Sequence, residues 1–430
     1  MSAPLNAALE TAILAAAREV EPETIALLES LVREPSLLGA EHGALSVMEQ
    51  AFSGAGLATA RVPVDPAVLE QRPGWSPPLI DYAGRDNVVA THHPTHSQGR
   101  SLLLQGHVDV VPTGPDRLWT TPPFQPDIRG GRLFGRGSAD MKAGLASMVM
   151  ALTALRRAGW QPAAELQMAA VIEEECTGNG AFAVMHALPP PAACLIPEPG
   201  PGFSALYVAE VGVVWAWVTV IGKPAHVRNK HEGVNAIEAA YVVMERFRAL
   251  EDQLNRAEHR HPAFAADNHP INVNVGTLQG GEWNSSVPTE TTIGVRVGVM
   301  PGQSCHAVRA ESEALVAAAG TDERLRGARL SVRFAGFMAD GCTFPPEQPI
   351  SRAVAAQHQR LTGQPVPHYA ATGLTDARHY ALGGIQATCY GPDGDNIHGI
   401  DESVGLDAVH QVTAVLALTI ASWCGLEPAG

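Results

Sequence analysis

The spacing of apolar residues predicts helices at the start of the chain and an α/β alternation after them. Apolar positions recur at helical intervals over residues 7–20, 22–32 and 42–52. Residues 62–85 are rich in proline and glycine, so we expect a surface excursion there. The alternation then consists of strands at 101–105, 166–172 and 193–196 and a helix at 143–158. Strands that alternate with helices indicate a parallel sheet covered on both faces.

The pattern changes after about residue 207. The next predicted elements are a strand at 208–221, a helix at 234–254, strands at 271–278 and 287–299, a helix at 304–319 and a strand at 329–334. This β-α-β-β-α-β order is that of a compact, ferredoxin-like α+β unit with its own core.

The α/β character returns from about residue 335. Helical patterns cover residues 350–361 and 406–423, and an apolar run at 385–390 predicts a strand. The simplest account is one α/β domain, residues 1–207 and 335–430, interrupted by an inserted α+β domain, residues 208–334.

Composition and charge exclude several classes of partner. Hydrophobic residues make up 46% of the 430 residues, which provides a sizeable core and excludes wholesale disorder. The net charge of −15 argues against nucleic acid and against an anionic membrane surface, because binding to either needs clustered Lys and Arg. No apolar run reaches ~18 residues, so we expect no span across a membrane.

The cysteines and the N-terminus indicate the compartment. The six cysteines are scattered and include no CxxC pair, which is typical of buried thiols in a reducing compartment. The first twenty residues lack the basic start and apolar core of a secretory signal. We therefore expect a cytoplasmic protein.

Polar residues that suit a metal ion stand at the ends of the predicted α/β strands. They are His107 with Asp109, Asp140 just before a helix, the run Glu173, Glu174 and Glu175, then Glu198, and later His398. In open α/β sheets the functional crevice lies at the carboxyl ends of the strands. We therefore expect residues far apart in the sequence to converge in one place.

The chemistry of these side chains favours a pair of metal ions. Imidazole and carboxylate ligands suit Zn²⁺, Mn²⁺ or Co²⁺. There are too many carboxylates for one ion, whereas two ions ~3.5–4 Å apart and bridged by a carboxylate would neutralise them. His107 and Asp109 lie at i and i+2 on a strand and face the same way, so Asp109 can orient the imidazole.

Each candidate also has an ordinary structural interpretation. A lone HxD is usually incidental, Asp140 can be a helix N-cap, three acids can form a solvated loop, and Glu198 between prolines can be a surface acid. Each of these interpretations is reasonable for one residue taken alone. Together they are a poor explanation, because all of the residues follow predicted strands or precede a helix at the same end of the α/β domain.

An ordered set of motifs resembles the co-catalytic zinc deacetylase and carboxypeptidase family. That family includes acetylornithine deacetylase, succinyl-diaminopimelate desuccinylase, aminoacylase and glutamate carboxypeptidase. The similar segments run in family order over residues 102–402 and are GHVDVVP, GRGSADMKAG, EEECTGNGA, PEPG, GKPAHV, GVNAI, VRVGVMPG, GLTDAR and GPDGDNIHGIDE. Each is weak alone, whereas the ordered set is specific, and EEECTGNGA is most similar to acetylornithine deacetylase-like proteins.

The resemblance implies a phosphorylase/hydrolase-like catalytic domain with two Zn²⁺ ions, for which Co²⁺ or Mn²⁺ can substitute. It implies that Asp140 bridges the metals, that His107 and Glu198 complete one site, and that Glu175 and His398 complete the other. It also implies that Glu174 is the general base and that Asp109 supports His107. Glu173 replaces the usual Asp, and a cis peptide is expected at Asp140–Met141.

The inserted domain carries a further candidate in His226. The resemblance implies that this domain dimerises or acts as a lid, and that His226 reaches the substrate in the partner subunit of a homodimer. From the residues alone, a surface histidine is the favoured interpretation of His226, and the adjacent GVNAI match tips the interpretation toward function. Arg296 and Arg378 are candidates for binding a substrate carboxylate, with structural ion pairing as the alternative.

The predicted activity is metal-assisted hydrolysis of an N-acyl amino acid, with Glu174 moving the proton. A dipeptidase or carboxypeptidase that acts on a short peptide is the alternative within the same mechanism. A metal-binding scaffold without catalysis is a remote alternative, because Glu174 is intact. A serine hydrolase is disfavoured because the chain has no GxSxG.

Overall fold

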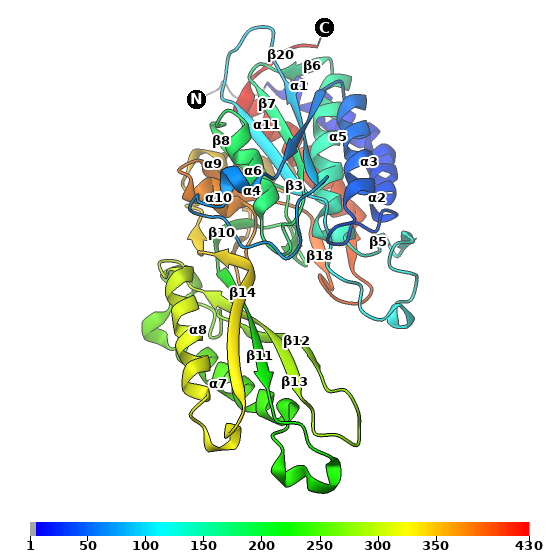
Figure 1. Cartoon of the computed structure of the whole chain (residues 1–430). Coiled ribbons are helices and arrows are strands. Elements are labelled where there is room, and N and C mark those ends of the chain that lie inside the picture. Colours follow the sequence, from blue (N-terminus) through cyan, green and yellow to red (C-terminus); the bar gives the residue numbers. More distant parts are fainter. Residues whose placement is uncertain (1–5, 430) are drawn as a thin grey trace.

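The chain folds into two bodies joined by two crossings of the backbone (Figure 1). The computed structural model describes residues 6–429, so residues 1–5 and 430 of the predicted α/β domain lie outside the described part. The larger body contains both ends of the described chain, and the smaller body is formed by the segment between β10 (Leu206–Glu210) and β15 (Cys342–Thr343).

The larger body is built on a six-stranded sheet with the order β1-β2-β7-β3-β8-β17. Its strands are β1 (Ala58–Pro63), β2 (Asp86–His92), β3 (Leu102–His107), β7 (Leu166–Val171), β8 (Ala193–Ile196) and β17 (Gln386–Cys389). β7, β3, β8 and β17 run parallel as predicted. β2 is antiparallel to β1 and β7, so the sheet is mixed, because apolar periodicity carries no information on strand direction.

Helices cover both faces of this sheet, with α2, α3 and α5 on one side and α6 and α10 on the other (Figure 1). The helices are α1 (Ala7–Glu19), α2 (Glu21–Val32), α3 (His42–Gly54), α4 (Pro66–Leu69), α5 (Ala143–Arg157), α6 (Asn179–Ala187), α9 (Pro349–Thr362), α10 (Ala377–Leu382) and α11 (Leu406–Cys424). The predicted helices are confirmed, with ends that differ by a residue or two. β3, β7 and β8 are buried at every position, which explains their continuous apolar runs.

α11 is the one helix within residues 6–429 whose length and composition would also suit a membrane span. In this structure two-thirds of that stretch is buried, and the helix packs against α5 and α9. The apolar character of α11 is therefore accounted for by its place in the core.

Three small sheets complete the larger body. A three-stranded sheet has the order β15-β10-β16, with β16 at His368–Ala371. A five-stranded sheet consists of β4 (Asp127–Arg129), β5 (Arg132–Phe134), β19 (Ser403–Gly405), β18 (Asp393–Asp395) and β9 (Gly200–Pro201). β6 (Trp160–Pro162) pairs with β20 (Leu426–Pro428). The five-stranded sheet brings the chain near residue 400 beside the turn that precedes α5.

The smaller body has the predicted β-α-β-β-α-β order. It consists of β11 (Gly212–Ile221), α7 (Ala236–Leu254), β12 (Val273–Gly280), β13 (Glu290–Val299), α8 (Cys305–Ala319) and β14 (Arg329–Ala339), and its antiparallel sheet has the order β12-β13-β11-β14. Side chains of Asn235 and Ser304 cap the starts of the two helices. Buried and half-buried residues alternate along β11, so one face packs on the helices and the other faces away.

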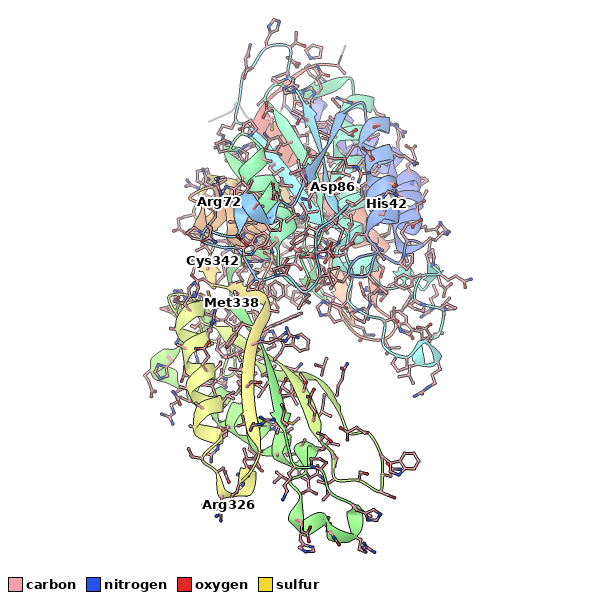
Figure 2. The ribbon with its side chains drawn as sticks, viewed as in Figure 1. His42, Arg72, Asp86, Arg326, Met338 and Cys342 are labelled. Atoms are coloured by element: carbon pink, nitrogen blue, oxygen red, sulfur yellow. The ribbon has the colours of Figure 1, made fainter. Side chains whose placement is uncertain are left out.

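The junction between the bodies differs from the prediction. The predicted strand at 208–221 is two strands in different sheets, and β14 continues past the predicted boundary at 334 to Ala339. Met338 and Cys342 lie where β14 meets the larger body (Figure 2). A Cβ on Gly212 would lie 2.3 Å from the carbonyl oxygen of Ala339, so only glycine permits the two crossings to lie this close. The apolar periodicity of the sequence does not predict where two distant segments of the backbone come this close.

The predicted surface excursion at residues 62–85 is partly wrong. It contains the end of β1 and the short α4, and its side chains Leu69, Ser76 and Tyr82 are buried. Ser76 accepts from the Met338 backbone N–H at 3.2 Å, and Pro77 accepts from the Gly336 N–H at 2.7 Å. The segment therefore packs into the core of the larger body and hydrogen-bonds to the end of β14.

Candidate metal centre

The parallel strands bring the predicted metal ligands to one edge of the main sheet. His107 is the last residue of β3, Glu174 and Glu175 follow β7, and Glu198 follows β8. Asp140 lies in the turn Ser138–Lys142 that leads into α5. His398 lies beyond β18, a short strand that the sequence did not predict. The predicted convergence is thus seen in the structure.

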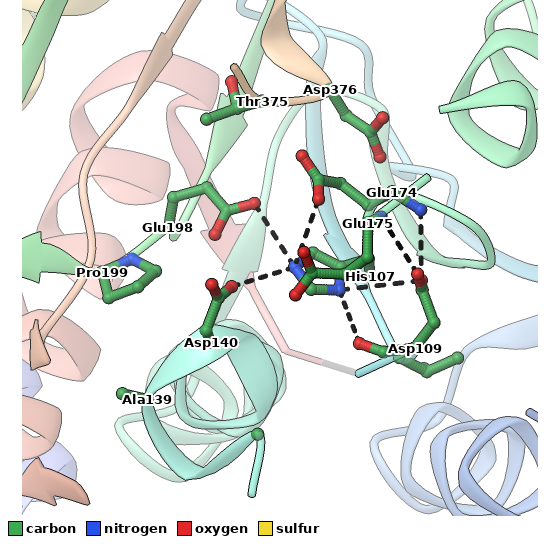
Figure 3. A network of polar contacts seen from close by, with 12 residues as sticks. His107, Asp109, Ala139, Asp140, Glu174, Glu175, Glu198, Pro199, Thr375 and Asp376 are labelled. Atoms are coloured by element: carbon green, nitrogen blue, oxygen red, sulfur yellow. Dashed lines mark hydrogen bonds and ion pairs between the residues drawn. The ribbon is translucent and has the colours of Figure 1, made fainter. Parts of the chain in front are cut away.

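Five of the six side chains form two groups that share Asp140, and a third cluster contains His107, Glu174 and Glu175. In the first group, His107 Nε2 lies 3.1 Å from Asp140 Oδ1 and 3.7 Å from Glu198 Oε1 (Figure 3). In the second, His398 Nε2 lies 3.4 Å from Asp140 Oδ2 and 3.1 Å from Glu175 Oε2. Within each group all donor atoms lie within 4.8 Å of one another. Because each oxygen of Asp140 faces a different imidazole, Asp140 has the geometry of a carboxylate that bridges two ions.

The surroundings of these side chains fit a pair of divalent cations. Glu198 Oε1 is buried and has no hydrogen-bond partner. Within residues 6–429, no Lys or Arg side chain lies within ion-pair distance of the Asp140, Glu174, Glu175 or Glu198 carboxylates. Several unpaired acids in one buried place are costly unless a cation neutralises them. Oxygen and imidazole donors together suit Zn²⁺, Mn²⁺ or Co²⁺.

Glu174 stands beside the first group without completing it. Its Oε2 lies 3.9 Å from His107 Nε2, and the residue is buried. Burial raises the pKa of Glu174 well above its usual value; His107 opposes this shift, whereas the charges of Asp376 and Glu198 add to it. A carboxylate next to the metal ligands is suitably placed to exchange protons with a reacting water.

Asp109 contacts His107 in a different way from the one expected. The Nδ1 of His107 lies 2.9 Å from the backbone carbonyl of Asp109, whereas the Asp109 carboxylate is 3.6 Å away. That carboxylate accepts instead from the backbone N–H groups of Glu174 and Glu175, at 3.2 and 3.1 Å (Figure 3). The i and i+2 spacing correctly predicted that Asp109 lies beside His107. However, the backbone carbonyl of Asp109 orients the imidazole, and the Asp109 carboxylate holds the loop that contains Glu174 and Glu175.

Glu173 is an anchor of that loop and lies in neither ligand group. Its backbone has φ 64°, and its carboxylate accepts from the Tyr82 hydroxyl at 2.6 Å and the Thr177 hydroxyl at 2.7 Å. Arg85 pairs with Glu173 and with Glu41 at once. Sequence reasoning missed Glu41, Tyr82 and Arg85, because they lie in segments without a motif.

Glu402 holds the turn that carries Asp140. Its carboxylate accepts from the backbone N–H groups of Gly137, Ala139 and Asp140 at 3.0–3.1 Å and pairs with Arg136 at 2.6 Å. Glu402 and Arg136 are both almost fully buried. The Asp140–Met141 peptide is cis, as the resemblance implies. The quoted segment GPDGDNIHGIDE contains Glu402, but no spacing argument linked it to Asp140.

Asp376 is a further acid that sequence reasoning missed, although the quoted GLTDAR contains it. Figure 3 shows its carboxylate beside Glu174. Asp376 Oδ1 is buried without a hydrogen-bond partner, and Oδ2 lies 3.3 Å from the amide of Gln105. Burial raises the pKa of Asp376 to about 6, although Arg378 and His107 oppose the shift.

His226 is exposed and lies far from the metal ligands of its own chain. It follows β11, which starts at the junction with the larger body and leads away from it (Figure 1). The nine residue steps of β11 span about 30 Å. The structure therefore does not bring His226 to the site within one chain, and its action in a partner subunit stays a prediction.

The two arginine candidates differ in position. Arg296 lines a cavity that also contains Glu174, Glu175 and His398. Arg378 is almost fully buried, donates to the backbone carbonyls of Thr375 and Thr177, and lines neither cavity beside the metal ligands. This position does not support a substrate role for Arg378, because its guanidinium hydrogen-bonds to the loop before α10 and to the loop before α6.

Known proteins share both the sequence pattern and the fold. Residues 103–422 match peptidase family M20/M25/M40. A succinyl-diaminopimelate desuccinylase from Xylella fastidiosa is 29% identical, covering 81% of this chain and 90% of that protein. An N-formyl-4-amino-5-aminomethyl-2-methylpyrimidine deformylase from Halalkalibacterium halodurans is 27% identical, covering 81% and 85%.

Solved structures agree on the fold. A di-peptidase from Saccharomyces cerevisiae superposes with a TM-score of 0.74 at 13% identity, covering 96% of this chain and 98% of that one. A dinuclear metal-binding peptidase of family M20 from Bacillus subtilis superposes with a TM-score of 0.57 at 14% identity, covering 93% and 98%. With the family match over most of the chain and the two ligand groups that share Asp140, this protein belongs to peptidase family M20/M25/M40 and is a metal-dependent hydrolase of amide bonds.

Proposed function

We propose that the protein is a zinc-dependent deacylase that hydrolyses an N-acyl amino acid to a carboxylic acid and a free amino acid. The observation that carries the proposal is the position of Asp140, whose two oxygens face the imidazoles of His107 and His398 separately. The names of the two relatives describe removal of an acyl group, succinyl in one and formyl in the other, which supports a deacylase.

The metal ligands in this proposal are the two groups described above. His107 and Glu198 would hold one ion, Glu175 and His398 the other, and Asp140 both. When bound, the pair supplies Lewis acidity that polarises an amide carbonyl and lowers the pKa of water. Zn²⁺ is the proposed ion because it accepts both imidazole and carboxylate ligands without a fixed geometry, and Co²⁺ or Mn²⁺ would be accepted as substitutes.

Glu174 is the general base and acid. It takes a proton from the water that attacks the acyl carbon, and it delivers that proton to the amine nitrogen as the carbon–nitrogen bond breaks. Asp109 holds the backbone of Glu174 and Glu175, so the base and a metal ligand keep a fixed spacing. Burial of Glu174 excludes competing solvent from the carboxylate.

A dipeptidase with the same residues is the second candidate. A dipeptide offers the same amide and the same terminal carboxylate, and the yeast protein of this fold is a di-peptidase by name. The decisive difference lies on the carbon next to the acyl carbonyl, because a dipeptide carries a free amine on that carbon and an N-acetyl amino acid carries none.

The proposal extends to a cytoplasmic homodimer in which the smaller body pairs with its copy and His226 acts in the partner's site. β12 is an edge strand whose residues are mostly exposed, which leaves a pairing surface. Dimerisation would also explain why His226 is remote from the metal ligands of its own chain. Six buried and unpaired cysteines support a reducing compartment.

The experiment is a substrate screen with zinc-loaded protein. We expect acetate release from N-acetyl amino acids to exceed dipeptide cleavage, and we expect Glu174→Gln to remove both activities. Faster cleavage of dipeptides than of N-acetyl amino acids would overturn the deacylase proposal in favour of the dipeptidase. Near-normal kcat in Glu174→Gln would overturn the mechanism.

A further inference from the structure

Two cavities adjoin the metal ligands and share part of their lining. The large cavity has a volume of about 580 Å³ and the small cavity about 210 Å³. The residues that line both are Glu174, Glu175, Gly373, Leu374 and His398. A substrate whose scissile amide lies at these shared residues therefore extends one half into each cavity.

The large cavity has an apolar wall made by segments of both bodies. The larger body contributes Leu37, Leu38, Leu79 and the run 110–112. The smaller body contributes Trp215 and Phe337, whose rings meet edge to face with centroids 5.3 Å apart. Cavities of this size, lined by aromatic and aliphatic side chains, bind groups of similar chemistry by desolvation.

One cation lines the large cavity. Arg296 pairs across the strands with Trp215 and donates to the backbone carbonyls of Asn272 and Thr372 at 3.0 and 2.9 Å. Three of its five N–H groups remain free of these bonds. Within residues 6–429 no carboxylate lies within ion-pair distance of its guanidinium. A mostly buried cation without a counter-ion is suited to an anionic group on the ligand.

The small cavity offers no cation and little room. Its wall away from the metal ligands includes Pro199, Tyr207, Tyr369 and Ile397, together with Thr375, whose hydroxyl donates to Glu210. The Tyr207 hydroxyl already donates to the Pro199 carbonyl at 2.8 Å, so it is not available to a charged ligand group. This cavity fits a short, uncharged acyl group.

We propose that the substrate is a short-acyl derivative of an amino acid with a large apolar side chain. The side chain lies against Trp215 and Phe337, the α-carboxylate binds Arg296, and the acyl group occupies the small cavity. This inference rests on the proposed deacylase function. The reaction breaks the acyl carbon–nitrogen bond of the amide, adds the hydroxyl of water to the acyl carbon, and leaves the amino acid with the proton.

The same walls disfavour amino acids with a second charge. An ammonium group on the side chain, as in ornithine or diaminopimelate, would lose its hydration against an apolar wall whose one cation is Arg296. Unpaired burial of that charge is more costly than the loss of a few methylene contacts. The chain therefore differs in substrate from what the name of its desuccinylase relative describes.

Two substrate series test the inference without altering the protein. The first varies the amino acid at constant acetyl group, using alanine, leucine, phenylalanine and ornithine. We expect kcat/KM to rise at least 10²-fold from N-acetyl-alanine to N-acetyl-leucine or N-acetyl-phenylalanine, because each methylene in an apolar pocket contributes about 10-fold or more. We expect kcat/KM for N-acetyl-ornithine to be lower than kcat/KM for N-acetyl-alanine.

The second series varies the acyl group on phenylalanine from formyl to acetyl to octanoyl. We expect octanoyl to be at least 10-fold slower than acetyl, because the small cavity cannot contain it. N-acetyl-phenethylamine, which lacks the carboxylate, should lose at least 10²-fold in kcat/KM if Arg296 binds that group. Equal kcat/KM values for N-acetyl-phenylalanine and N-acetyl-phenethylamine would show that Arg296 does not bind the substrate carboxylate.

Trp215→Ala and Trp217→Ala provide a matched pair of variants. Both residues lie on the same face of β11 and line a further cavity, but Trp217 does not line the large cavity and donates to the Ala335 carbonyl. We expect Trp215→Ala to lower the ratio of kcat/KM for N-acetyl-phenylalanine to that for N-acetyl-alanine at least 10-fold, and Trp217→Ala to leave this ratio unchanged. A ratio unaffected by Trp215→Ala, or a preference for ornithine, would overturn the inference. Absence of hydrolysis for every amide would instead refute the proposed function.

Discussion

Asp140 is the residue on which the geometry of the site depends most. Its two oxygens face two imidazoles, and its backbone N–H is held by Glu402, which lies 262 residues away in the sequence. Glu402 also stands four residues after His398, so one short segment carries a predicted metal ligand and fixes the backbone of another. Any change in that segment is expected to affect both groups of ligands.

Glu174→Gln tests the assignment of the base. The amide has nearly the same shape as the carboxylate but cannot accept the proton of water, so we expect kcat to fall about 10²–10⁴-fold. Bound metal, measured by elemental analysis, should stay as in the wild type. Glu175→Gln is the matched control on the next residue, and it should lower metal content. Near-normal kcat in Glu174→Gln would mean that another residue of the acidic run is the base.

Glu402→Ala tests the support of Asp140. The substitution removes the acceptor of three backbone N–H groups and leaves Arg136 buried without its partner. We expect metal-free protein to lose about 3–5 kcal/mol of unfolding free energy in urea. Glu23→Ala, which breaks the exposed pair with Arg157, should cost at most about 1 kcal/mol. Similar small losses in both variants would show that Glu402 is dispensable.

At the scale of elements, apolar periodicity was sufficient for the helices and for the central strands. The three continuous runs became β3, β7 and β8, and their parallel order placed His107 and the later acids at one edge. Periodicity failed where structure depends on contacts between distant segments. The break between β10 and β11 needs Gly212 beside Ala339, and the burial of Tyr82 needs Glu173.

Glu210, at the end of β10, provides a test of how β10 is held. Its carboxylate accepts from the backbone N–H and the hydroxyl of Thr375 at 3.0 and 2.8 Å. Burial raises the pKa of Glu210 to about 7, although Thr375 and Arg378 oppose the shift. Because the folded pKa exceeds the ordinary value of 4.5, its contribution to stability is greatest at low pH and is lost as the pH rises through 7.

Glu210→Gln should remove that dependence. From pH 5 to pH 8 the wild type is expected to lose about 2 kcal/mol of unfolding free energy relative to the variant. Urea unfolding of both proteins at the two pH values measures the difference. If the difference in unfolding free energy between the wild type and Glu210→Gln does not change with pH, Glu210 is ionised throughout this range in the folded protein.

At the scale of the whole molecule, the separation of the two bodies is the central feature. The smaller body supplies Trp215 and Arg296 to the large cavity from the near end of its sheet, whereas His226 lies beyond the far end of β11. A single chain therefore uses only the near end of this body at its own site. In the proposed homodimer, the far end would lie at the site of the second copy.

Mixing two inactive variants, His226→Ala and Glu174→Gln, tests that arrangement. A heterodimer pairs an intact Glu174 site with an intact His226 from the other chain. Half of the dimers are mixed and each has one restored site, so about a quarter of the wild-type activity should return after subunit exchange. No recovery, with exchange demonstrated by a subunit label, would place His226 in its own chain's site or outside catalysis.

The most direct test of the account is the rate of amide hydrolysis as a function of bound zinc. Chelated protein is titrated with Zn²⁺, and bound metal per chain and the initial rate on an N-acetyl amino acid are measured in the same samples. We expect no activity without metal and a rate that rises until about two equivalents are bound, because Asp140 serves two groups of ligands. Full activity in metal-free protein would contradict the account.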